Sequence, residues 1–373
     1  MAAPSLADAA AMATTAVGAT LNVHYGDNST QHYKLAYQPF FITGEQVPDG
    51  KGGTILSGGY FDIHNKAIID RSVAGKERQF FSDSPDGTSL LSLQNPSVTG
   101  IKGKAVFAVV QFEYLTRDQL GAATEKNNAY GTLPSPIAVL TLDQDQRTGK
   151  LSLVKYHNVD TSSAHGLWIT CGASLSPWNT HLSSEEYEPD AQFIADNALF
   201  KKYSKNLFGN ENKANPYHYG HLPEITVNPD GSGTIKKHYC LGRISHELIQ
   251  VMPDNRTVLM GDDYTNGGFF MFVADKEKDL SAGTLYVAKV GAGFSVDPSA
   301  LGATLSWIKL GHATSAEIEK LADTLKPTDI MSSVKTDPLD SSYTKIFADG
   351  IANWVKLKPG MEKAAAFLET HRY

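Results

Sequence analysis

The sequence predicts an all-β protein built of small antiparallel sheets with helical insertions. Three observations support this. Pairs of short apolar segments are separated by turn-forming residues, helical patterns are few and widely spaced, and turn residues are scattered evenly, among them 32 Gly and 17 Pro in 373 residues. Such a meander of hairpins is typical of a β-sandwich or a β-propeller.

The strands come in chain order as follows. Residues 104–114 (KAVFAVVQFEY) are apolar and β-branched and predict one long strand. Four hairpins come after it, each made of two apolar segments around a polar connection. They pair 137–142 with 151–157, 222–227 with 234–239, 248–252 with 257–260, and 269–273 with 284–290.

Helices are predicted at 191–203, 315–325 and 361–371, where apolar residues recur every three or four positions. Their wide spacing suits insertions between the blades of a β-propeller rather than βαβ units. We expect a single propeller domain over residues 1–373. The last helical pattern is still running at Tyr373, so we expect this domain to be incomplete at its C-terminus.

Composition excludes some classes of protein. Lys and Arg total 33 against 40 Asp and Glu, giving a formal net charge of −7, so no nucleic-acid binding is expected. No apolar run reaches the roughly 18 residues of a membrane span. Met1 to Gly18 carries no Lys or Arg, so no export signal is evident, and the sequence leaves the compartment open.

The first candidate site lies in residues 170–186, which hold Cys171, Glu185 and Glu186. A thiolate suits iron, zinc or copper, whereas carboxylates suit calcium, magnesium or ferric iron, so this segment offers a mixed set of metal ligands. The alternative is a buried, inert Cys171 with two solvated glutamates. A disulfide between Cys171 and Cys240, the two cysteines of the chain, is also open.

The second candidate site combines His246 and Glu247 with Asp262 and Asp263. If residues 248–260 form a hairpin, Glu247 and Asp263 meet at one end of it. Two carboxylates held together repel each other unless a proton or cation lies between them, and a divalent cation with oxygen ligands resolves the conflict. The alternative is that these residues are turn and loop residues.

Taken in order, these segments resemble a known family. Cys171-Gly with Pro177-Trp178 and Glu185-Glu186, Gly242-Arg243 with His246-Glu247, Gly261-Asp262-Asp263, and the segment 283–289 (GTLYVAK) resemble the PhoX-type alkaline phosphatases. The similarity covers about residues 171–289, and the closing segment 356–373 resembles the family's helical linker. The chain would correspond to the N-terminal portion of a family member.

The resemblance implies a β-propeller that carries Fe³⁺ and Ca²⁺ in a periplasmic or secreted phosphomonoesterase, exported folded. In that family Cys171 would be an iron ligand, and Glu186, Glu247 and Asp263 would also hold metals. The sequence departs from the pattern at Ile244, where the family usually has an aromatic residue. Later family segments, which supply further ligands and a phosphate-contacting Arg, have no counterpart in these 373 residues.

The expected partner is a phosphate monoester, and the complete protein is expected to be a monomer. Several closely held cations can neutralise the oxygens of such a substrate. His246, Trp178 and Asn179 are candidates for orienting substrate or water, and no catalytic residue can be assigned. Two alternatives stay open: a metal-stabilised propeller used as a binding or structural module, and a hydrolase of another ester, such as a sulfate.

Overall fold

The computed structural model describes residues 18–35, 37–121, 129–264, 267–293, 299, 302–348 and 350–373. By its contacts the chain divides into two units, residues 1–42 and 43–373. In the first unit, β1 (Thr20–His24) and β2 (Thr30–Lys34) form an antiparallel hairpin. The expectation of one domain over residues 1–373 stays a prediction.

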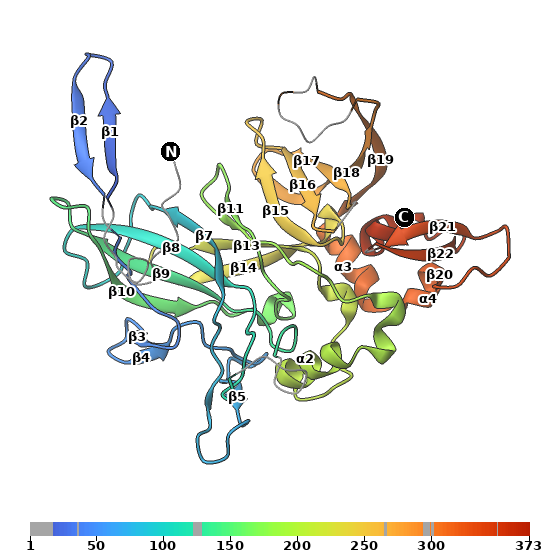
Figure 1. Cartoon of the computed structure of the whole chain (residues 1–373), viewed down its shortest axis with the longest axis horizontal. Coiled ribbons are helices and arrows are strands. Elements are labelled where there is room, and N and C mark those ends of the chain that lie inside the picture. Colours follow the sequence, from blue (N-terminus) through green and yellow to red (C-terminus); the bar gives the residue numbers. More distant parts are fainter. Residues whose placement is uncertain are drawn as a thin grey trace. The chain divides into compact units, whose positions relative to one another are not determined.

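The second unit consists mainly of antiparallel sheets in which strands that follow one another in the sequence lie side by side (Figure 1). Sheet 1 has the spatial order β10-β9-β8-β7 and sheet 2 the order β11-β12-β13-β14. The strands of sheet 1 are β7 (Pro85–Leu91), β8 (Lys104–Phe112), β9 (Ile137–Gln144) and β10 (Leu151–Asn158). Those of sheet 2 are β11 (Ser174–Leu175), β12 (His181–Leu182), β13 (Leu222–Val227) and β14 (Gly233–His238).

Sheet 3 has the order β15-β16-β17-β18-β19, and sheet 4 the order β20-β22-β21. The strands of sheet 3 are β15 (His246–Val251), β16 (Thr257–Asp262), β17 (Phe269–Lys276), β18 (Asp279–Val290) and β19 (Leu305–Thr314). Those of sheet 4 are β20 (Met331–Val334), β21 (Thr344–Ala348) and β22 (Ile351–Leu357). Two short pairs complete the strands: β3 (Gln46–Pro48) with β4 (Thr54–Leu56), and β5 (Ile69–Asp70) with β6 (Arg78–Gln79).

The four predicted hairpins are confirmed as β9–β10, β13–β14, β15–β16 and β17–β18. The last one differs in its length, because its strands continue through the polar stretch that was expected to be a connection. They are joined at Glu277 and Lys278, the latter in the left-handed region with φ 61°. Backbone pairing satisfies the peptide groups whatever the polarity of the side chains, so exposed polar residues extend this hairpin.

The α-helices are α2 (Ala198–Phe208), α3 (Ser315–Thr324), α4 (Pro327–Ile330) and α5 (Glu362–Leu368). The predicted helix at 191–203 is displaced toward the C-terminus. Residues Ala191–Asp196 form a 3-10 helix, and α2 begins after Asn197, whose side chain caps it by accepting from the Phe200 amide. The helix predicted at 361–371 ends at Leu368, and a 3-10 turn follows at Thr370–Arg372.

Two buried apolar clusters join these elements. One contains Phe107 and Val139 of sheet 1 together with Ile225 of sheet 2. The larger one contains side chains of sheets 2 and 3 and of the helices α3 and α5, among them Phe272 and Phe367. Among the described residues, no strand of one sheet pairs with a strand of another, so side-chain burial holds the sheets together.

The first strands of sheets 1, 2 and 3 are neighbours, because β11 contacts both β7 and β15. Each of these sheets runs outward from that strand in chain order. The predicted all-β class is thus confirmed as a mostly β chain of small antiparallel sheets with few helices. In the part of the chain that the structure describes, a closed ring of sheets is not seen.

Candidate functional site

Acidic side chains gather where β7, β11 and β15 lie together. Asp86 of β7, Glu113 just beyond β8 and Cys171 before β11 each place a ligand atom within 4.8 Å of the other two. The Cys171 thiol points at Asp86, with Sγ 3.8 Å from Oδ2. A thiol and two carboxylates at this separation are close enough to bind one cation together.

Hydrogen bonds to the backbone hold Cys171 in place. Its carbonyl oxygen accepts from the Gly87 amide at 3.2 Å and from the Gln111 side-chain amide. The Gly172 carbonyl oxygen accepts from the same Gln111 amide at 3.1 Å and from Ser184 Oγ at 2.6 Å. The loop before β11 is thus fixed to sheet 1, and the thiol has a defined direction.

Two glycines let the three segments come this close. A Cβ atom on Gly172 would lie 2.3 Å from the carbonyl oxygen of Glu247, and one on Gly87 would lie 2.8 Å from that of Cys171. Both of these atoms are backbone carbonyl oxygens, so a side chain at either position would push the segments apart. Glycine at both positions is therefore what brings β7 and β15 to the two sides of the Cys171 loop.

A buried histidine orients Gln111. His181 Nε2 lies 2.9 Å from Gln111 Oε1, and its Nδ1 lies 2.8 Å from Ser89 Oγ. Because the Gln111 amide nitrogen already donates to backbone carbonyls, its oxygen must accept from Nε2, so Nδ1 accepts from Ser89. Burial lowers the pKa of His181 to about 3, which keeps this ring neutral in its bridging role.

The adjacent glutamates at 185 and 186 have opposite roles. Glu185 is fully buried and accepts from Lys237 Nζ at 2.9 Å and from three backbone amides, those of Trp168, Gly220 and His221. All of its oxygens are therefore occupied within the core. Glu186 points the other way, toward the cluster, where its carboxyl group hydrogen-bonds with Asp263.

Asp262 and Asp263 likewise have different roles: Asp262 supports the backbone, and Asp263 contacts Glu186. Asp262 Oδ1 accepts from the Ser245 amide at 3.0 Å and braces the entry to β15. Asp263 Oδ2 accepts from the Tyr187 hydroxyl at 2.6 Å, and the same carboxylate hydrogen-bonds with Glu186. These two hydrogen bonds lower the pKa of Asp263, so it stays ionised.

Glu113 connects Asp86, which lies beside Cys171, with Glu186, which lies beside Asp263. Its carboxyl group hydrogen-bonds with both Asp86 and Glu186, and Glu247 lies within electrostatic range. Burial and the neighbouring Asp86 raise the pKa of Glu113 to about 7. Burial and Asp263 raise that of Glu186 to about 9. We call the whole set the acidic cluster: Asp86, Glu113, Cys171, Glu186, Glu247 and Asp263.

The acidic cluster has the character of a cation site. In the described residues no Lys, Arg or His forms an ion pair with any of its members. Burial, Glu186 and Glu113 raise the pKa of the Cys171 thiol well above its ordinary value. One soft ligand among five hard ones fits both iron and calcium, and like charges crowded in this way are relieved by a bound cation.

Of the four residues proposed from the sequence as metal ligands, Cys171, Glu186 and Asp263 are linked by hydrogen bonds within the acidic cluster. Glu247 of β15 lies within electrostatic range of Glu113. Metal binding by them stays a prediction. Both cysteines are free thiols, which removes the disulfide alternative. Cys240 is buried, and its Sγ donates to the Leu280 carbonyl at 3.2 Å.

Sequence reasoning missed Asp86 and Glu113. In the sequence, the residues around Asp86 have the composition of a turn and Glu113 comes at the end of an apolar segment, so no local signal marks either. Each of the three residues considered for orienting substrate has a polar atom engaged elsewhere, although in the described residues the buried His246 Nδ1 has no hydrogen-bond partner. Trp178 Nε1 donates to Glu224 at 2.8 Å, Asn179 donates to the Ser92 carbonyl at 3.0 Å, and buried His246 contacts the Gly242 carbonyl at 3.1 Å.

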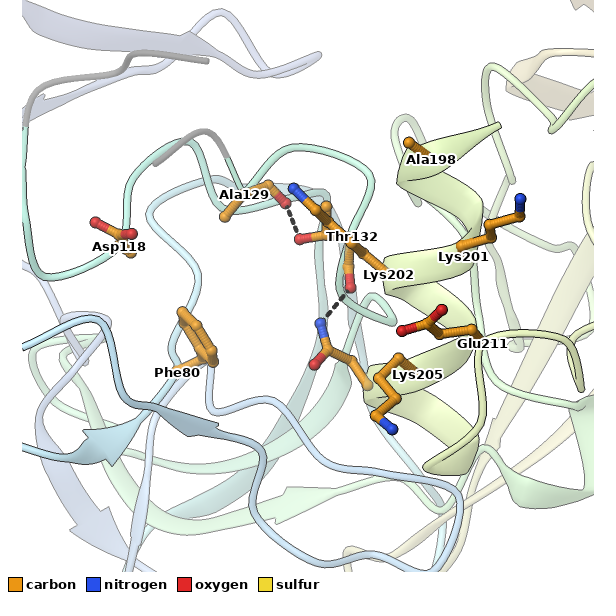
Figure 2. A pocket seen from close by; sticks show the side chains of 10 residues that line it. Phe80, Asp118, Ala129, Thr132, Ala198, Lys201, Lys202, Lys205 and Glu211 are labelled. Atoms are coloured by element: carbon orange, nitrogen blue, oxygen red, sulfur yellow. Dashed lines mark hydrogen bonds between the residues drawn. The ribbon is translucent and has the colours of Figure 1, made fainter. Parts of the chain in front are cut away.

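A separate pocket of about 470 Å³ lies beside α2 (Figure 2). Lys201, Lys202 and Lys205 of this helix line it together with Asp118 and Glu211, and it shares no residue with the acidic cluster. Its lysines are exposed or half-buried surface side chains. Lysines of this kind are ordinary on a solvated helix face, so we assign no function to this pocket.

The comparison with known families agrees with the chemistry of this site. An acidic cluster with a thiol at the junction of small β-sheets is compatible with a metal-dependent hydrolase. The family model for the alkaline phosphatase PhoX matches residues 145–351, more than half of the chain. The chain therefore belongs to the PhoX alkaline phosphatase family, a family of hydrolases.

The match includes Cys171, Glu186, Glu247 and Asp263, whereas Asp86 and Glu113 lie before it. A search of curated proteins finds no match to the chain. Among the described residues, the helices are too short or too polar to cross a membrane.

Proposed function

We propose that this protein is a metal-dependent phosphomonoesterase whose acidic cluster holds iron and calcium. The observation that carries the proposal is the cluster itself, in which one thiol and four carboxyl groups from separate segments converge, with Glu247 in electrostatic range, and without a basic partner among the described residues. We further propose that the sheets belong to a β-propeller and that the protein acts as a monomer in the periplasm or outside the cell. These last points rest on the family resemblance.

The ligand assignment follows from donor type. Cys171 would hold iron through its thiolate, since sulfur is the softest ligand in the cluster. The carboxylates of Glu186, Glu247 and Asp263, with Asp86 and Glu113, would hold iron and calcium through oxygen. When bound, these cations would supply Lewis-acid charge for the oxygens of a phosphate ester.

The chain's own groups would have to change protonation to bind cations. The Cys171 thiol and the Glu186 carboxyl carry protons at neutral pH in the metal-free chain, because their pKa values are raised. Both would release these protons on binding. Asp86 and Glu247 are exposed, so the cluster is open to solvent on their side, where a phosphate monoester could approach.

The test is metal content beside activity, in wild-type protein and in the variant Cys171→Ser. Serine is nearly isosteric but does not ionise near neutral pH, so this variant should lose its iron and the visible absorbance of a ferric thiolate. Turnover of an aryl phosphate should fall at least about 100-fold, since several kcal/mol of transition-state stabilisation would be removed.

Cys240→Ser is the matched control, because Cys240 is buried in the apolar core, where its Sγ hydrogen-bonds with Leu280 and Ser315. It should keep both iron and activity. A Cys171→Ser protein with unchanged iron and turnover would refute the proposal. A colourless wild-type protein that binds only calcium would point to a binding module, and turnover of an aryl sulfate instead of a phosphate would point to another ester.

A further inference from the structure

Tyr187 is held in an unusual backbone conformation beside the acidic cluster. Its φ is 46°, in the left-handed region that favours Gly and Asn over aromatic residues. Ile169, whose carbonyl oxygen accepts from the Glu186 amide at 2.9 Å, also has a positive φ of 33°, which is rarer still for a β-branched residue. Two strained residues therefore lie on the two segments that carry Cys171 and Glu186.

Every polar group of Tyr187 is fixed by a partner. Its amide donates to Ser245 Oγ at 2.8 Å, and its carbonyl oxygen accepts from Trp168 Nε1 at 2.9 Å. Its hydroxyl donates to Asp263 Oδ2 at 2.6 Å. The ring packs edge-on against Tyr264, with centroids 5.5 Å apart. Strained conformations persist where the surroundings over-determine them in this way, and such places cluster at functional sites.

The conformation has a geometric consequence. In extended chain, side chains alternate between two sides, so Glu186 and Tyr187 would point apart. Here both reach the carboxylate of Asp263, Glu186 by a hydrogen bond and Tyr187 through its phenol. A left-handed residue directly after Glu186 is what allows two consecutive side chains to hold one carboxylate from sheet 3.

We infer that Tyr187 is a positioning residue of the cation site: its hydroxyl fixes the orientation of the Asp263 carboxylate toward the cluster. The inference rests on the proposed function only in taking Asp263 as a metal ligand. Removal of a partner that orients a metal ligand in this way usually lowers metal affinity about 10- to 100-fold.

The experiment measures Ca²⁺ binding by calorimetry on the full chain after removal of metals, for wild type, Tyr187→Phe, Asp263→Asn and the double variant. Tyr187→Phe keeps the ring contact with Tyr264 and removes only the hydroxyl. We expect it to weaken Ca²⁺ binding about 10-fold in the wild-type background and to have no further effect in the Asp263→Asn background. Tyr343→Phe, in the turn before β21, is the control and should bind as wild type.

Wild-type Ca²⁺ affinity in Tyr187→Phe would overturn the inference, and so would an equal loss in both backgrounds, which would indicate a general structural effect. The midpoint of thermal unfolding of the metal-free variants separates the same two cases, because a positioning role leaves it unchanged. Failure of the proposed function has a different signature: no phosphatase activity in a wild-type protein whose Ca²⁺ binding still depends on Tyr187.

Discussion

Glu185 and Glu186 show how much one residue of offset decides. They are the same amino acid at adjacent positions, yet Glu185 forms a buried ion pair with Lys237 and Glu186 belongs to the acidic cluster. Consecutive side chains leave an extended backbone in opposite directions, so one faces the core and the other the site. Burial of Glu185 therefore helps to direct the Glu186 side chain into the site, although Glu185 does not belong to the site.

Substitution by glutamine should separate the two roles. Glu185→Gln leaves the Lys237 ammonium buried without its carboxylate, and we expect it to lower the free energy of unfolding by about 3–5 kcal/mol. Glu186→Gln replaces a group that is already protonated at neutral pH in the metal-free chain. It should change stability by less than about 1 kcal/mol while reducing bound metal.

Urea unfolding of the metal-free proteins, with elemental analysis of the loaded ones, measures both effects. The two variants differ by one position and share the same chemical change, so each is the control for the other. Equal losses of stability, or normal metal content in Glu186→Gln, would contradict this division of roles.

At the scale of elements, Glu224 of β13 ties sheet 2 to the loop between β11 and β12. Its carboxylate accepts from Trp178 Nε1 at 2.8 Å and Thr180 Oγ1 at 2.6 Å, and it lies 2.7 Å from His238 Nε2. Lys236 adds an ion pair at 3.1 Å. Only β11 and two residues before it separate this loop from Cys171, so Glu224 stabilises the segment next to the site.

These partners give Glu224 a defined pH dependence. Burial alone would raise its pKa, but the hydrogen bonds from His238, Thr180 and Trp178 outweigh burial and hold the pKa well below its ordinary value of 4.5. For a carboxyl group with a lowered folded-state pKa, the stabilisation is fully present above the unfolded-state pKa. It is lost as pH falls from there through the folded-state value.

We therefore expect Glu224→Gln to lower the free energy of unfolding by about 3 kcal/mol at pH 7, the contribution of hydrogen bonds to one buried charge. The difference from wild type should shrink as the pH is lowered below 4.5. Urea unfolding at pH 7 and pH 4 measures it, with Glu277→Gln in the exposed β17–β18 turn as control. If the difference in free energy of unfolding between wild type and Glu224→Gln grew as the pH fell, this prediction would be contradicted.

At the scale of the whole second unit, the acidic cluster is where three sheets meet. Asp86 comes from sheet 1, Cys171 from the loop into sheet 2, and Glu247 and Asp263 from sheet 3. The sheets are otherwise joined by apolar packing and by buried hydrogen bonds such as those of His181 with Gln111 and Ser89. A cation bound by all three would therefore link them, and it would also relieve the repulsion among the carboxylates.

Calcium should accordingly stabilise the fold. Ligand that binds only the folded state at 100 times its dissociation constant adds about 2.7 kcal/mol, so the thermal midpoint of EDTA-treated protein should rise by several degrees when Ca²⁺ is restored. Sodium chloride at equal ionic strength is the control for simple screening. An unchanged midpoint with Ca²⁺, or an equal rise with sodium chloride, would argue against a cation site at the sheet junction.

The sequence by itself determined the mostly β class and the four hairpins, and it predicted a metal site in the segments around Cys171, Glu186, Glu247 and Asp263. It could do so because apolar strand segments and turn residues are local signals. The motifs around these four residues, taken in order, carry the family resemblance. The helix predicted at 191–203 begins later for a local reason also, since the Asn197 side chain caps α2.

Only the tertiary structure decided which acidic groups meet. Asp86 and Glu113 are 85 and 58 residues from Cys171 along the chain, and nothing near them in the sequence marks them. They join the site because Gly87 and Gly172 let β7, the Cys171 loop and β15 approach one another. The left-handed backbone of Tyr187 is likewise set by partners in other segments, Trp168, Ser245 and Asp263. Local pattern fixes what each strand is, whereas contacts between distant segments fix which side chains share one site.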